Sequence, residues 1–159
     1  MSPKLTLGAA IAAILIIAIA IAPSANAQSP NDACSLLTQA QVRAALIVPV
    51  NAGTSTPDKK VCTWNVSAPT AKGLKFVTLF LEDMSVYQSG KQASPGRAVT
   101  PVSSVGDDAY YSTMGTFVLL HVKKGSVAFR VSLYAGADIP MEKKQDMEKT
   151  LALQVASEL

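Results

Sequence analysis

The sequence predicts an α+β domain, a mainly antiparallel sheet of five or six strands flanked by N-terminal and C-terminal helices. Three patterns lead to this prediction. Apolar residues recur at every fourth position near the C-terminus, several short segments alternate between apolar and polar residues, and turn residues separate these segments. The chain contains no internal repeat and no low-complexity tract, so a single fold has to account for all of these patterns.

The first 27 residues have the layout of a secretory signal peptide. Lys4 supplies an early cation, an apolar run extends to Ala22, and Ala25 and Ala27 form a small-residue cleavage site. Because the apolar run approaches the roughly 17–25 residues that span a bilayer, an uncleaved membrane anchor is the alternative. Contact with a membrane is expected only in that case.

The remaining residues suffice for one domain with a core of its own. We predict a signal peptide over 1–27, a flexible leader over 28–33 and a single α+β domain over 34–159. A lipid anchor on Cys34 is not expected, because Pro30 and polar residues separate this cysteine from the apolar run. Export would place the domain in the periplasm, in the cell envelope or outside the cell.

Cys34 and Cys62 are the only cysteines of the chain. An exported pair in an oxidising compartment is most simply one disulfide bond. The alternative is a redox-active or nucleophilic cysteine, but the C-x-x-C spacing is absent and the nearest cations are Lys59 and Lys60. We therefore expect a structural disulfide that ties the first helix to the strand around Cys62.

The first half of the domain begins with a helix whose N-terminus is a capping box of Thr38 and Gln41. A loop is expected over 51–58, which is rich in small and polar residues. The segment 62–66 alternates as a half-buried strand does, and 74–81 is apolar on both faces, which is typical of a central strand. Trp64 is assigned to the core.

The second half is predicted to start with a short helix over 84–91 and an extended segment over 99–103. A turn at 105–108 leads into the next strand. The clearest pattern is a hairpin of 116–122 and 127–134. With Lys124-Gly125 as its two-residue turn, Val122 would face Val127, Leu120 would face Phe129 and Val118 would face Val131.

The last helix follows Ile139-Pro140 and is predicted to dock on the sheet through an apolar stripe. The stripe consists of Met147, Leu151, Val155 and Leu159, with Ala152 and Ala156 beside it. The lysine pairs Lys59-Lys60, Lys123-Lys124 and Lys143-Lys144 are assigned to solvated surface. The formal net charge is +3, too small for a nucleic acid partner in a chain without a binding motif.

The chemistry in the sequence does not form a recognisable catalytic centre. His121 is the only histidine, and in a strand such a residue is more often part of a satisfied sheet than a base. No G-x-S-x-G elbow, S-x-x-K dyad or phosphate loop is present, and a zinc site lacks ligands. A hydrolase or transferase with His121 as base is kept as an alternative; it requires a hydroxyl and a carboxylate within hydrogen-bond reach.

The acidic pairs Glu82-Asp83 and Asp107-Asp108 are assigned to capping, of the helix near Met84 and of the turn at Gly106. A calcium site at Asp107-Asp108 is not expected, because no D-x-D-x-D-G loop surrounds it. No cofactor is therefore predicted for this chain.

A binding surface is expected on the face of the hairpin opposite its apolar pairs. This face carries Phe117, Leu119, His121, Arg130 and Ser132. Among the aromatic residues, Tyr110, Tyr111 and Tyr134 are the candidates for the same surface. The function that follows is a non-catalytic exported protein that binds a protein partner or a small ligand, and a structural or inhibitory accessory subunit is the other alternative.

Three motifs resemble those of a known group: D-A-C-S-L-L-T at 32–38, C-T-W at 62–64 and V-G-D-D-A-Y at 105–110. The chain is similar to exported bacterial proteins, many of them actinobacterial lipoproteins, whose single domain is a domain of unknown function. The resemblance implies a helix-flanked antiparallel sheet and a disulfide between Cys34 and Cys62. It implies no catalytic residues, and this chain lacks the lipobox cysteine of the lipoproteins.

Overall fold

A computed structural model of the chain describes residues 30–68, 73–136 and 138–159. The predicted signal peptide lies outside the described residues. In chain order the elements are η1 (Ala33–Ser35), α1 (Gln39–Leu46), β1 (Thr54–Ser55), β2 (Val61–Asn65), β3 (Leu74–Glu82), α2 (Met84–Gly90), β4 (Ala98–Val102), β5 (Asp108–Met114), β6 (Phe117–Lys124), β7 (Val127–Ala135) and α3 (Met141–Ser157). None of the described helices is both long enough and apolar enough to cross a membrane.

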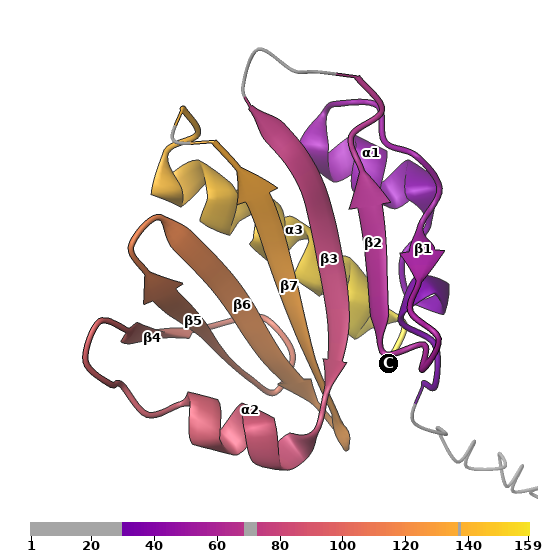
Figure 1. Cartoon of the computed structure of the whole chain (residues 1–159). Helices are drawn as coiled ribbons and strands as arrows, with labels where there is room; N and C mark the ends of the chain where they lie inside the picture. Colours follow the sequence, from indigo (N-terminus) through magenta and orange to yellow (C-terminus); the bar gives the residue numbers. More distant parts are fainter. Residues whose placement is uncertain (1–29, 69–72, 137) are drawn as a thin grey trace, which may run out of the picture.

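The strands form one antiparallel sheet in the order β1-β2-β3-β7-β6-β5-β4 (Figure 1). The predicted fold class is confirmed, but the described residues form seven strands and not five or six. The difference comes from β1, which lies in the segment 51–58 that was expected to be a loop and pairs Thr54 with Thr63. A strand of two residues is too short to produce an alternating pattern in the sequence.

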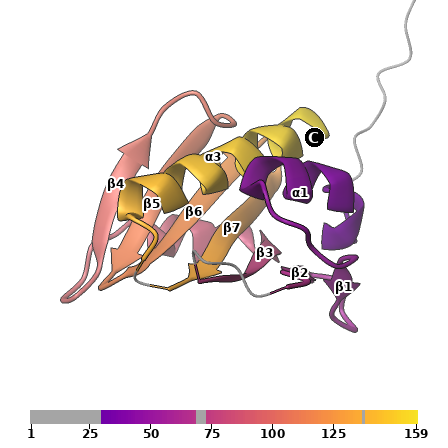
Figure 2. The same cartoon turned by 90° about the horizontal axis from the view of Figure 1, so that it is seen from above.

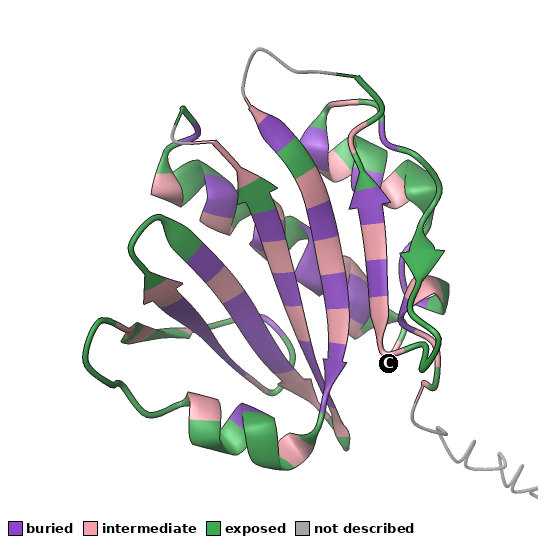
Figure 3. Ribbon diagram, viewed as in Figure 1, coloured by how far each residue is buried: buried purple, intermediate pink, exposed green. Residues whose placement is uncertain are grey.

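The sheet has one face covered by two helices and another that is mostly uncovered. Helices α1 and α3 lie side by side on the first face, and α2 lies on the other, at one end of β6 and β7 (Figure 1, Figure 2). The core between the sheet and the two helices includes the buried side chains of Trp64, Leu79, Leu120, Phe129 and Leu151. Figure 3 shows the alternation of buried and partly exposed residues along the central strands.

Helix α1 begins as predicted, with a capping box in which Thr38 accepts a hydrogen bond from the Gln41 N–H. Its C-terminus was not predicted. Ile47 follows the helix in the left-handed region, with φ of 56°, and its side chain is 86% exposed. This backbone conformation costs an L-residue roughly 1–2 kcal/mol, and glycine is the residue that usually occupies it.

We expect Ile47→Gly to stabilise the protein by about 1 kcal/mol, because relief of the left-handed strain exceeds the entropy that glycine loses on folding. Urea unfolding monitored by Trp64 fluorescence measures the change. Ala44→Gly, exposed within the same helix, is the control and should destabilise by about 1 kcal/mol. Equal losses for both variants would refute the strain at Ile47.

The hairpin of β6 and β7 forms, but its predicted register is wrong by two residues. Val122 lies opposite Phe129, whereas Val127 was expected there. The turn is Gly125-Ser126 and not Lys124-Gly125, and Gly125 has φ of 58°. Glycine at the first central position is the preference of type II′ hairpin turns. Because strand side chains alternate with a period of two, this shift leaves every residue on its predicted face.

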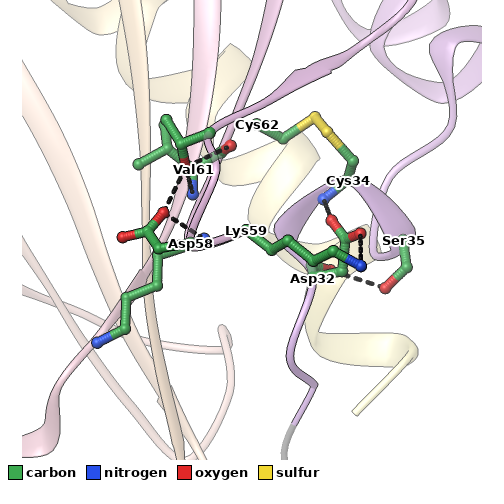
Figure 4. Close-up of polar contacts among 9 residues, drawn as sticks. Asp32, Cys34, Ser35, Asp58, Lys59, Val61 and Cys62 are labelled. Atoms are coloured by element: carbon green, nitrogen blue, oxygen red, sulfur yellow. Dashed lines mark hydrogen bonds and ion pairs between the residues drawn. A yellow bond between two sulfur atoms is a disulfide. The ribbon is translucent and has the colours of Figure 1, made fainter.

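The disulfide between Cys34 and Cys62 is confirmed and joins η1 to β2 (Figure 4). Asp32 holds the chain next to this disulfide. Its Oδ1 accepts a hydrogen bond of 2.9 Å from the Cys34 N–H, and its Oδ2 lies 3.7 Å from Lys59 Nζ. Ala33 is fully buried. Residues 32 and 33, which were assigned to the leader, therefore pack against the domain.

The acidic pairs do not form the predicted capping hydrogen bonds. Asp83 occupies the N-cap position of α2, but its side chain makes no capping bond and pairs with Lys60 Nζ at 2.9 Å. Asp107 accepts a hydrogen bond of 2.7 Å from the Gly125 N–H, and therefore holds the β6–β7 turn and not the turn at Gly106. The Lys60 ammonium group and the N–H of the β6–β7 turn bind these carboxylates instead.

Helix α3 docks through the predicted stripe, with Leu151, Ala152 and Val155 buried. Two charged residues share this buried face. Lys144 was assigned to solvated surface, but it is 4% exposed and its Nζ lies 3.4 Å from the Thr116 carbonyl oxygen. A long side chain can bury its stem while its ammonium group reaches an acceptor, and the charge pattern alone does not show this.

Glu148 is the second buried charge of α3 and is fully enclosed. Its Oε1 accepts a hydrogen bond of 2.9 Å from the Leu133 N–H of β7, directly beyond the last β6–β7 pair of Leu119 and Ser132. Its Oε2 is buried without a partner among the described residues. Burial raises the pKa of Glu148 to about 9, against the opposing effects of the Leu133 N–H and of Lys144.

Candidate functional site

The candidate site is the face of the sheet opposite α1 and α3, which we call the open face. It is formed by alternate residues of β2, β3, β7, β6 and β5, and α2 covers one end of it (Figure 1). The antiparallel registers arrange these residues in rows across the strands. Three of these rows are described below.

The first row, which we call the aromatic row, consists of Phe76, Tyr134 and Phe117. Phe76 and Tyr134 are paired across β3 and β7, and their parallel rings stack with centroids 4.8 Å apart. Phe117 of β6 lies 6.0 Å from Tyr134. Phe117 is 55% exposed, and its β5 neighbour Met114 is 57% exposed. Contiguous apolar exposure of this kind marks interaction surfaces.

The second row is polar and only half-buried. Thr78 and Ser132 are paired across β3 and β7, and their hydroxyl oxygens lie 2.5 Å apart in a hydrogen bond. Leu119 of β6 continues the row on the other side of Ser132. The row therefore places hydrogen-bonding groups and one apolar side chain directly beside the aromatic row.

The third row contains Phe80, Arg130, His121 and Tyr110 in register across four strands. Glu82, the next residue of the open face along β3, binds two of them. His121 Nδ1 lies 2.9 Å from Glu82 Oε2, and Arg130 lies 3.4 Å from Glu82 Oε1. The Glu82 side chain is completely buried, so these two partners compensate for the removal of its carboxylate from water.

Arg130 and His121 differ in how much of each side chain reaches solvent. The Arg130 side chain is 32% exposed, and its guanidinium lies 5.0 Å from the centroid of the Phe80 ring. The Tyr110 ring stacks on the His121 ring, with the two centroids 4.6 Å apart. The His121 side chain is 8% exposed. No described residue forms a hydrogen bond with His121 Nε2.

Helix α2 covers the Tyr110 end of the third row. The Tyr110 hydroxyl donates a hydrogen bond of 2.9 Å to the Tyr87 carbonyl oxygen of α2, and burial raises the pKa of Tyr110 to about 12. Burial also raises the pKa of Tyr87, and the nearby Asp108 carboxylate adds to this effect. Both tyrosines therefore stay neutral at physiological pH and act as packing groups.

The structure brings together six of the residues that were predicted as a binding surface. Phe117, Leu119, His121, Arg130, Ser132 and Tyr134 all lie on the open face. Tyr110 shares this face but is covered by α2, with 1% of its surface exposed.

Tyr111 does not belong to the surface. It points to the opposite face, where its hydroxyl donates a hydrogen bond of 2.7 Å to the Gln145 carbonyl oxygen of α3. Adjacent residues of a strand face opposite sides, so Tyr110 and Tyr111 cannot share one surface.

Lys75, Phe76 and Glu82 also belong to this site, but they were not predicted as parts of it. Lys75 extends over the Tyr134 ring, with Nζ 5.7 Å from the centroid. The alternation of 74–82 was a usable signal, because it places Phe76 and Glu82 on the face that also carries Phe80. Phe76 lies beside Tyr134, and Glu82 near Arg130, only because of the register between β3 and β7. The sequence pattern does not predict this register.

Comparisons with family models, with curated proteins and with solved structures found no match. Within the described ranges, no group of three or more His, Cys, Asp or Glu side chains could hold a metal ion.

Proposed function

We propose that this chain is a non-catalytic exported protein of the periplasm or cell envelope that binds a partner protein or a small ligand through the open face. The observation that carries the proposal is the aromatic row, whose Phe117 is 55% exposed beside Met114 at 57%. A sheet held by a disulfide and a large core has no structural need for these exposed side chains. Binding gives them a role.

Export is supported by two observations. The disulfide between Cys34 and Cys62 fits an oxidising compartment, and the sequence at 1–27 fits a signal peptide. The resemblance to exported bacterial domains of unknown function points in the same direction and belongs to this proposal.

The second candidate is a hydrolase or transferase with His121 as base, which the Glu82–His121 pair favours. A carboxylate at Nδ1 fixes the ring in the way that catalytic histidines require. However, no described serine or threonine hydroxyl is hydrogen-bonded to His121, and Tyr110 lies against its ring. Arg130 also shares the same carboxylate. These contacts favour a structural role for His121, as a hydrogen-bond partner of the buried Glu82 carboxylate.

The test compares two apolar-to-serine variants of the full chain recovered from its own secretion route. We expect native mass spectrometry to detect bound mass on the wild type, loss of that mass in Phe117→Ser, and its retention in Leu153→Ser. Leu153 is a matched control, because it is 44% exposed on α3, away from the open face. Retention in Phe117→Ser, or substrate turnover that is lost in His121→Ala, would contradict the proposal.

A further inference from the structure

The three central strands of the open face carry an unbalanced charge. On this face, strands β3, β6 and β7 carry three Lys and Arg residues and a single carboxylate. The cations are Lys75, Lys123 and Arg130, and the carboxylate is Glu82, whereas Lys124 alternates to the other face and pairs with Asp107. Because Glu82 is completely buried, no carboxylate of these three strands is presented to solvent on the open face.

Two of the cations lie beside the aromatic surface and remain accessible. Lys75 is exposed and sits over the Tyr134 ring, and Arg130 is partly exposed over the Phe80 ring. Such contacts hold a cation at a defined place on an apolar surface while its other side stays hydrated. A ligand on this face therefore meets flat apolar groups and positive charge together.

The charge pattern selects against a second copy of the chain as the occupant. In a two-fold pairing of open faces, each face presents the same surface to the other. Lys75 and Arg130 would then face a surface whose nearest carboxylates are Glu82, which is buried, and Asp108 of β5, which is already paired with Lys91. Like charges placed opposite each other oppose association, whereas an acidic surface would be attracted.

The shape of the face favours a protein over a small molecule. Small ligands bind mostly in concave pockets, whereas protein interfaces are flat and enriched in aromatic residues, methionine and arginine. The described hollows of the surface lie around α1, between α1 and α3, around the start of α3, at the end of β3 and at the β6–β7 turn. The aromatic row lines none of them.

We propose that the occupant of the open face is a partner protein that presents carboxylates beside apolar or aromatic side chains. Its apolar groups pack on Phe117, Tyr134 and Met114, and its carboxylates pair with Lys75 and Arg130. This inference rests on the proposed function and adds the chemistry of the partner to it.

The test uses a displayed library of short random peptides as the probe, captured on the immobilised full chain. The retained peptides should be enriched in Asp and Glu next to apolar residues, and their binding should weaken as salt screens the charges. Lys75→Glu should reduce the affinity for the retained peptides about tenfold, because it replaces attraction by repulsion. Lys143→Glu makes the same charge change at an exposed position of α3 and should leave the affinity unchanged.

The outcomes separate this inference from the proposed function. If the retained peptides are neutral or basic and Phe117→Ser fails to bind them, the acidic partner is overturned but the open face remains a binding surface. If acidic peptides bind Lys75→Glu and Phe117→Ser with the same affinity as the wild type, the result counts against both the inference and the proposed function. Failure to retain any acidic peptide would overturn the inference. Melting temperatures of both charge variants verify that each is folded.

Discussion

Glu148→Gln should stabilise the protein by about 2–3 kcal/mol at pH 7. The wild-type carboxyl is fully buried on α3, and burial raises its pKa from 4.5 to about 9. Glutamine is neutral at every pH and keeps an oxygen that can accept the hydrogen bond from the Leu133 N–H. The variant therefore removes a titration without removing the contact that joins α3 to β7.

The sign of the pH dependence follows from the raised pKa. Below pH 4.5 the folded and unfolded chains both carry a protonated Glu148, and its contribution to stability is fully present. As pH rises from 4.5 toward about 9, the unfolded chain releases this proton while the folded chain retains it, so stability is lost. The advantage of glutamine should therefore be small near pH 4 and grow steadily toward pH 9.

Urea unfolding of both proteins across this pH range measures the effect as a difference in free energy. Glu142→Gln, exposed on the same helix, controls for the loss of one negative charge. If the difference in unfolding free energy between the wild type and Glu148→Gln does not change with pH, Glu148 is not held protonated in the fold.

Removal of the disulfide should have the other large effect on stability. The Cys34–Cys62 bond closes a loop with a sequence separation of 28 residues. In the chain-entropy account, opening such a loop costs about 3.5 kcal/mol, a large share of the stability of a domain of this size. We therefore expect Cys34→Ala/Cys62→Ala to lose about 3.5 kcal/mol while it retains the fold at low temperature.

Denaturant unfolding of the double variant, beside the wild type with and without a reductant, measures this cost. The reduced wild type should behave like the double variant, because both have lost the same crosslink. A loss below about 1 kcal/mol would mean that the packing of η1 on β2, and not the bond, fixes this region.

Local signals in the sequence were sufficient for most of the fold. Thr38 and Gln41 marked the start of α1, and alternation assigned the faces of β6 and β7 correctly even though their register was wrong by two residues. The register depends on whether Gly125 is the first or the second central residue of the turn. Gly-containing dipeptides allow both readings, so packing decides between them.

The candidate site was predicted only in part, because its contacts join distant segments. Phe117, Leu119, His121 and Arg130 belong to one hairpin and were found by alternation. The Glu82–His121 pair spans 39 residues, and only the strand order β3-β7-β6 brings its members together. The buried state of Glu148 was missed for a related reason, since a charged residue on a helix is normally assigned to solvent.

The most direct test of the open face is site-specific photo-crosslinking in the native secretion host. A photoreactive phenylalanine analogue is placed at Phe117 in one strain and at Leu153 on α3 in another, so that each probe lies on a different face of the same folded protein. Our account predicts that one discrete crosslinked product forms from position 117, that Lys75→Glu reduces it, and that it is absent from position 153. Equal crosslinking from both positions, or a discrete product from position 153 alone, would contradict the assignment of function to the open face.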